Sequence, residues 1–204
     1  MTQTMVDQTR AEVVNYRSPS SENALTAYVG MIVFLGSWFM LFAGLFFTYG
    51  GLRLRADVWP PVNMPALPLD VGWFNSVLIV LSSCILLDGQ RLIRSDKRRL
   101  FAKRALVATV LGLGFLMVQL YSWIDLYGSG LTLQSGAYGS IFYTLTTFHG
   151  LHVAIGIVAL AGLTWKGFRG QYNAARHTPV RLWSIYWHFV GAIWLFLFWT
   201  VYLV

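Results

Sequence analysis

Long apolar segments without charge constrain this chain more than any other feature. A transmembrane helix needs about 17–25 mainly apolar residues, and a helix satisfies its own backbone hydrogen bonds inside lipid. Segments without Asp, Glu, Lys or Arg occupy residues 24–52, 71–87, 105–124, 140–165 and 182–204. We therefore predict an all-α fold, a polytopic membrane bundle of five transmembrane helices. Residues 24–204 form this domain, and residues 1–23 form a polar N-terminal tail.

The composition favours a membrane protein and argues against nucleic-acid binding. Charged residues make up 11% of the chain, whereas soluble domains average about 25%. Basic cytoplasmic loops account for the net charge of +7 in a membrane protein. We therefore predict a multi-pass protein of the bacterial cytoplasmic (inner) membrane that has no nucleic-acid partner.

The distribution of Lys and Arg predicts the orientation of the chain. Residues 91–104 include seven basic side chains, residues 166–181 include four and the N-terminal tail includes two, whereas the opposite loops contain only Arg53 and Arg55. Cytoplasmic loops of membrane proteins carry an excess of Lys and Arg. We therefore expect the N-terminus in the cytoplasm and the C-terminus outside.

The sequence offers no motif for catalysis or metal binding. Cys84 is its only cysteine, so it has no disulfide pair and no Cys-x-x-Cys spacing for an iron–sulfur cluster or a c-type haem. It also has no nucleophile–base pair, carboxylate dyad or phosphate loop. We expect no catalytic residue, metal ligand or cofactor ligand in this chain.

Two histidines and two small residues indicate a packed site in the fourth apolar segment. His149 and His152 are three residues apart and therefore share one face of a helix. Gly150 and Ala154 form a small-xxx-small patch on a neighbouring face, where another backbone can approach closely. An unpaired imidazole is costly in hydrocarbon, so we expect neighbouring polar side chains to bind both histidines.

Two further polar side chains lie within the third and fifth segments. We expect Gln119 and His188 to hydrogen-bond inside the bundle, as polar groups in transmembrane helices do. The alternative for the histidines is a haem held between His152 and His188, the two that come closest to a common depth. A contact with a lipid or a partner protein is a third possibility for them.

Small residues and one acid mark the first and second segments. Ser37 belongs to a stripe with Gly30 and Gly44, seven residues apart, which favours close helix packing within the bundle or, as the alternative, against a partner subunit. Asp88 is the acid that we place at the end of a span. We expect it to pair with Arg91 at the level of the cytoplasmic headgroups, and the alternative is a role in proton transfer.

Six motifs in chain order resemble subunit III of the haem–copper terminal oxidases. They are GMIVFLGSWFMLFAGLFF in the first segment, VWPP at 58–61, YGSIFY at 138–143, FHGLHV at 148–153, YWHF at 186–189 and WLFLF at 194–198. The resemblance covers nearly everything after residue 27. The chain looks like the shorter, five-helix form of this family, and VWPP and YGSIFY favour its cytochrome c oxidase branch.

The resemblance implies a redox-inactive subunit of a complex that reduces dioxygen to water and pumps protons in aerobic electron transport. It places haem and copper in subunits I and II, and none in this chain. The chain is expected to stabilise subunit I, to bind phospholipid and to support proton uptake. Trp38, Ser122 and Gly191 replace three acids of the family pattern, so a role for those carboxylates is not implied here.

Other functions stay open at this point. Five-helix subunits of this kind are similar to subunits of quinol oxidases and to an accessory subunit of nitric-oxide reductase. A protein of another class, a stand-alone five-helix transporter or a b-type cytochrome, also fits five apolar segments. A transporter is expected to show broken helices or polar residues that converge at mid-membrane.

Overall fold

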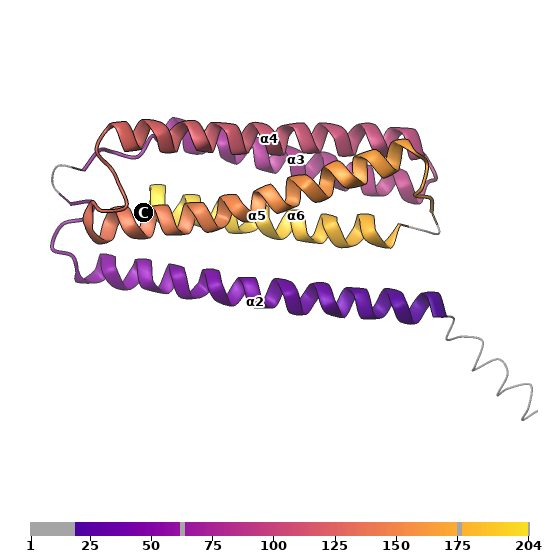
Figure 1. Ribbon diagram of the computed structural model, residues 1–204, viewed down its shortest axis with the longest axis horizontal. Helices are drawn as coiled ribbons and strands as arrows, with labels where there is room; N and C mark the ends of the chain where they lie inside the picture. Colours follow the sequence, from indigo (N-terminus) through magenta and orange to yellow (C-terminus); the bar gives the residue numbers. More distant parts are fainter. Residues whose placement is uncertain (1–18, 62–63, 175–176, 204) are drawn as a thin grey trace, which may run out of the picture.

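The computed structural model of the protein describes residues 19–61, 64–174 and 177–203, and within these ranges all regular structure is helical (Figure 1). The elements are α2 (Pro19–Arg55), α3 (Leu69–Arg94), α4 (Arg98–Gly128), α5 (Gly136–Phe168), α6 (Thr178–Leu197) and the π-helix η1 (Phe198–Leu203), which continues α6. Five of the described helical segments are long and apolar enough to cross a membrane. The predicted all-α bundle of five transmembrane helices is confirmed.

The helices extend beyond the charge-free segments that predicted them. α2 begins at Pro19, so its first residues belong to the segment expected as a polar tail, and residues 1–18 lie outside the described ranges. α3 includes Asp70 in its first turn, and α4 includes Asp125 near its end. Asp88 is therefore not the only acid close to a span. A helix can continue into the headgroup layer with charged side chains, because water is available there.

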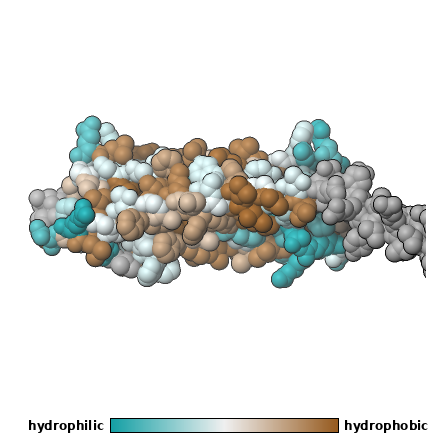
Figure 2. Space-filling view, turned by 90° about the horizontal axis from the view of Figure 1, so that it is seen from below, coloured by the Kyte–Doolittle hydropathy of each residue, from teal (hydrophilic) through white to brown (hydrophobic). Residues whose placement is uncertain are grey.

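Four helices form the body of the bundle, and α2 lies along one edge. α4 packs between α3 and α5, whereas α2 has its main contacts with α5 and α6. The most apolar window of α2 is only 6% buried, against 33–56% for the other four spans. Figure 2 shows apolar side chains along the middle of one face and hydrophilic ones towards both ends, as expected for a bundle surrounded by lipid.

Three helices end in the same capping motif. In the Schellman motif, a residue in the left-handed conformation follows the helix and two amides bond back to its last turn. Gly130 (φ 93°) and Gly170 (φ 69°) hold that position after α4 and α5. After α3 the position is occupied by Asp96, with φ 56°, and the Lys97 amide donates to the Leu92 carbonyl. Aspartate tolerates this conformation better than most residues, so α3 can end without glycine.

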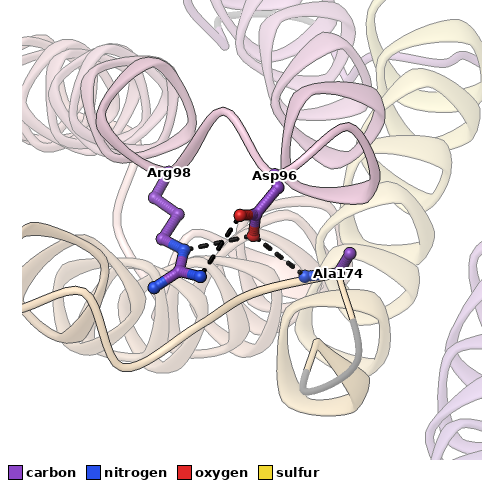
Figure 3. A network of polar contacts seen from close by, with 3 residues as sticks. All are labelled: Asp96, Arg98 and Ala174. Carbon is purple, nitrogen blue, oxygen red and sulfur yellow. Dashed lines mark hydrogen bonds and ion pairs between the residues drawn. The ribbon is translucent and has the colours of Figure 1, made fainter.

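Asp96 also connects two loops at this end of the bundle. Its carboxylate accepts bonds from Arg98 Nε at 3.1 Å and Nη2 at 3.2 Å, and from the backbone amide of Ala174 at 3.4 Å (Figure 3). The Arg98 hydrogen bond lowers the pKa of the Asp96 carboxyl. Slight desolvation opposes this effect, and the Ala174 amide adds to it. The ionised carboxylate therefore holds the α5–α6 loop beside the α3–α4 loop.

This contact predicts a pH-dependent loop. The folded-state pKa of Asp96 is depressed, so its stabilising contribution is present above the unfolded value, about 3.9, and is lost as the pH falls through the folded value. Asp96→Asn keeps a residue that tolerates the left-handed conformation but removes the charge. We expect faster hydrogen exchange at the Ala174 amide in Asp96→Asn at neutral pH. At a pH below the folded-state pKa of Asp96, the protection factor of this amide in the wild type should approach that of Asp96→Asn.

The effect is expected to be small, because both side chains are about half exposed and exposed ion pairs are weak. Asp125→Asn, an exposed acid at the opposite end of the bundle, is the matched control and should leave Ala174 exchange unchanged. Equal exchange rates in wild type and Asp96→Asn at neutral pH would contradict the role of the carboxylate.

Candidate functional site: the buried polar layer of the bundle

Two tryptophans of α6 bind two serines of α3 inside the bundle. Trp187 Nε1 donates to Ser82 Oγ at 3.0 Å, and Trp194 Nε1 donates to Ser76 Oγ at 3.1 Å. Ser82 in turn donates to the Ala108 carbonyl of α4 at 2.9 Å. All four of these side chains are at most 5% exposed. The bonds tie α6, α3 and α4 together without any charge.

Two glycines make room for one of these tryptophans. A Cβ atom on Gly112 of α4 or on Gly156 of α5 would lie 2.7 Å from the nearest indole carbon of Trp187. The indole therefore occupies the space that two side chains would otherwise fill. Neither glycine was predicted to have this role. Their sequence signal was only that each interrupts an apolar segment, which many glycines in transmembrane helices do.

His152 packs among aromatic rings and bonds to its own helix. Its ring lies edge-on to Trp38 with centroids 3.6 Å apart, and Phe42 lies 5.4 Å away. Its Nδ1 is hydrogen-bonded to the Phe148 carbonyl, and its Nε2 has no partner among the described residues. The backbone carbonyl of His152 accepts a bond from the Tyr186 hydroxyl at 3.0 Å. His152 therefore hydrogen-bonds inside the bundle, but to a backbone carbonyl of its own helix and not to a neighbouring polar side chain.

His149 is even more isolated. Its side chain is 1% exposed, and neither ring nitrogen has a partner within the described part of the chain. The nearest rings are those of Trp194 at 5.4 Å and Phe115 at 5.9 Å between centroids. The expected polar side chain does not bond directly to His149 within this part of the chain. Packing brings aromatic rings to this position, because α4 and α6 present Phe115 and Trp194 to the same face of α5.

Gln119 bonds across the bundle, and Ser37 does not. Gln119 Oε1 accepts a bond from Asn75 Nδ2 of α3 at 3.1 Å, and both side chains are buried. Ser37 is exposed and donates to the Phe34 carbonyl of its own helix at 2.7 Å. A Cβ on Gly30 or on Gly44 would meet nothing within 4 Å in the described structure. The first interpretation of this stripe, packing within the bundle, is therefore wrong.

Gly150 and Ala154, expected to allow a close backbone approach, have different surroundings in the structure. A Cβ on Gly150 would lie 3.2 Å from Cη2 of Trp123, so an indole ring and not a backbone faces this glycine. Ala154 is half-buried and lines a shallow groove beside Trp183. The Trp123 ring of α4 reaches Gly150 because tryptophan is long enough to extend across the space between the two helices.

Asp88 is paired, but with a different arginine from the one expected. Its Oδ2 lies 2.9 Å from Nε of Arg104 on α4, and both side chains are about half exposed. The expected partner Arg91 is on the same helix. The antiparallel packing of α3 and α4 brings Arg104 closer, which sequence spacing could not indicate. Both charged groups lie at the end of the bundle that carries the basic loops.

His188 and the polar layer show no cluster of metal-binding side chains within the described ranges. His188 is half-buried, and its Nε2 has no partner there. No group of three or more His, Cys, Asp or Glu side chains that could hold a metal ion is found among the described residues. The polar groups described above are amides, hydroxyls, indoles and imidazoles. They can fix helices to one another and bind small polar molecules.

Comparison with known proteins gives consistent matches along the chain. Residues 16–204 match the family described as "Cytochrome c oxidase subunit III". The "Cytochrome c oxidase subunit 3" of Thermostichus vulcanus is 38% identical over 86% of this chain and 86% of its own length. The protein of the same name from Synechocystis sp. is 35% identical over 85% of this chain and 74% of its own. The "Probable cytochrome c oxidase subunit 3" of Mycobacterium bovis is 34% identical over 86% and 87%.

Proposed function

Because the chain belongs to the cytochrome c oxidase subunit III family, we propose that it serves a proton-pumping terminal oxidase as a subunit without a redox centre. Haem and copper are held by the partner subunits I and II, where dioxygen is reduced to water. The chain contributes stability to subunit I, a site for phospholipid and support for proton uptake. The observation that carries this proposal is a transmembrane helix, α2, that is largely uncovered.

One face of α2 is suited to a partner helix. Leu35, Phe42 and Tyr49 are buried and form its inward stripe. Gly30, Ser37 and Gly44 repeat with the same period on the opposite side, and all three are exposed. Small residues allow two transmembrane helices to approach closely. We therefore assign the outer face of α2 to subunit I.

The expected result for Gly44→Leu is loss of the chain from the oxidase without loss of its fold. A Cβ there meets nothing within 4 Å in the described chain, whereas a leucine would separate α2 from a partner helix. Gly162→Leu on α5 is the matched control, because a Cβ at that position also has open space. The measurement is purification through a tag on this chain, with haem absorbance per chain as the readout.

We expect haem-bearing subunits to copurify with the wild type and with Gly162→Leu, and several-fold less with Gly44→Leu. If Gly44→Leu retained the haem-bearing subunits fully, α2 would not be the helix that contacts subunit I. A wild-type chain that purifies as a homo-oligomer without haem absorbance would overturn the oxidase assignment itself.

His152→Ala should leave the haem content per complex unchanged, whereas loss of one haem would support ligation by this chain.

A groove between α2 and α6 is suited to the acyl chains of a phospholipid. It has a volume of about 750 Å³ and is lined mainly by phenylalanines, including Phe39, Phe46 and Phe196. A second groove of about 470 Å³ lies between the starts of the same helices, lined by Ala27 and Trp183 among others. Near it Arg181 stacks on Tyr28, with Cζ 5.1 Å from the ring centre. Basic side chains at a membrane surface attract anionic lipid headgroups.

Support for proton uptake is indirect in this proposal. Two of the positions where the family pattern has acids offer little room for one, since Trp38 packs against His152 and a Cβ on Gly191 would lie 3.3 Å from Ser83 Oγ. The third, Ser122, is neutral and buried. We propose that the chain affects proton uptake by holding subunit I and lipid in place, without a carboxylate of its own.

The orientation proposed from the basic loops can be tested by cysteine labelling in intact cells. In a Cys84→Ser background, cysteines at Ser95 and Asn173 should be protected from a membrane-impermeant thiol reagent, because these loops carry the excess of Lys and Arg. A cysteine at Ser129 should react. Permeabilised cells provide the control for reactivity at all three positions. Labelling at Ser95 with protection at Ser129 would reverse the orientation.

A further inference from the structure

Besides His152, four polar side chains that are at most 2% exposed have hydrogen-bonding atoms without partners among the described residues. They are Asn75 Oδ1, Gln119 Nε2, Ser122 Oγ and both ring nitrogens of His149. Nearly all buried polar groups in folded proteins have a partner, in the protein or in ordered water. A cluster of unpaired atoms in one bundle therefore needs an explanation.

The four side chains lie at one depth of the bundle. Thr109 and Thr164 face each other with hydroxyls 3.4 Å apart, and further along the same pair of helices Trp123 lies against Gly150. This antiparallel register places Ser122 within about one helical turn of His149. The His149 ring also neighbours Phe115, which shares the buried face of α4 with Gln119 and Ser122.

Asn75 joins the same layer from α3. Its amide nitrogen donates to Gln119 Oε1 at 3.1 Å, which leaves its own oxygen and the Gln119 nitrogen unpaired. Exchanging oxygen and nitrogen in both carboxamides reverses this bond but again leaves one donor and one acceptor unpaired. The Tyr202 hydroxyl also contacts Gln119, whereas Ser122 Oγ and the His149 ring nitrogens have no such partner among the described residues.

The free atoms are a mixture of donors and acceptors. A neutral imidazole has one N–H donor and one acceptor nitrogen, a hydroxyl has both functions, and a carboxamide presents an N–H₂ or an oxygen. A cation would need acceptors only, and a carboxylate ligand would need donors only. Water both donates and accepts, and a buried water typically makes about three hydrogen bonds.

We propose that ordered water binds inside the bundle between α3, α4 and α5, with His149, Ser122, Gln119 and Asn75 as its partners. The water connects the imidazole of α5 to the hydroxyl and the amide of α4 and so completes the hydrogen bonding of this layer. The site is distinct from the lipid groove and from the α2 surface, and it does not depend on the proposed partner interface.

The direct test is a structure of the purified oxidase complex at a resolution that shows ordered water. The expected result is density within hydrogen-bond distance of Ser122 Oγ and of one His149 ring nitrogen, and its loss in Ser122→Val. Direct side-chain bonds that pair His149 with Ser122 or Gln119, or apolar packing around the imidazole without density, would overturn the proposal.

A thermodynamic cycle provides a second, independent measurement. If Ser122 Oγ holds water, Ser122→Ala lowers the melting temperature, and the drop is at least halved in a His149→Phe background because the shared water is already lost. If the hydroxyl is unpaired, removing it leaves the melting temperature unchanged or raises it. Ser37→Ala, on the exposed face of α2, is the matched control and should show no coupling with His149→Phe.

Discussion

Gly156→Leu is expected to prevent normal packing of the bundle. Even the Cβ of the new side chain would lie 2.7 Å from the indole of Trp187. The ring cannot move away freely, because its N–H is bonded to Ser82 and Gly112 lies close to it on the other helix. Overpacking of a core costs about 1–3 kcal/mol and occasionally more, and we expect the upper end here.

The measurement is the amount and the melting temperature of the chain in the purified complex. A loss of 3 kcal/mol corresponds to a drop of about 6–12 °C for a chain of this size. Gly162→Leu, on the same helix with open space around its Cβ, should retain near wild-type values. Removing the ring in Gly156→Leu/Trp187→Ala should recover part of the loss. A Gly156→Leu protein as stable as the control would show that the Trp187 position is easily rearranged.

Trp194→Ala is expected to be the other severe substitution. The indole donates to Ser76 and packs edge-on to Phe115, with ring centroids 4.7 Å apart. It also covers one side of His149. In lipid, helix association depends on packing and hydrogen bonds more than on exclusion of water, so an empty volume here removes the main stabilising contribution. Large-to-small changes of this type cost about 3–5 kcal/mol in soluble cores, and we expect about 3 kcal/mol.

Trp199→Ala is the control for this prediction. Trp199 lies on η1, close in sequence, but is 54% exposed, and lipid chains can replace its contacts. Thermal dissociation of the chain from the complex should therefore separate the two variants clearly. Trp194→Phe should fall between them, since it keeps an aromatic ring but loses the bond to Ser76. Equal melting temperatures for Trp194→Ala and Trp199→Ala would contradict the role of the buried indole.

The secondary structure and the class of protein could be predicted from the sequence. The hydrocarbon core of a membrane excludes charged side chains, and a helix is the simplest structure that hydrogen-bonds all backbone N–H and C=O groups there. A charge-free segment of sufficient length therefore indicates both a helix and a membrane protein. The first and last residues of the helices were predicted less accurately. α4 begins at Arg98 and includes Asp125, because charged side chains at a helix end reach water without interrupting the helix.

The partners of individual side chains were decided by the tertiary structure. The pairing of Asp88 with Arg104, the indole of Trp123 at Gly150 and the open face at Gly44 depend on which helices are neighbours and on their register. Neither property is encoded in the spacing of residues along one helix. The periodicity of apolar residues does not show which helices are neighbours. The shapes of a few side chains that pack together decide this.

His149 shows the same division most clearly. Its sequence surroundings, an apolar helix with a second histidine three residues away, determined that it lies in the membrane and must be buried or paired. Only the three-dimensional arrangement placed Phe115 and Trp194 beside it and left both ring nitrogens without a partner in the described structure. The physical reason is that burial and helix formation follow from the local composition of the sequence. Each hydrogen bond between helices needs two atoms that are distant in sequence and that only the fold brings together.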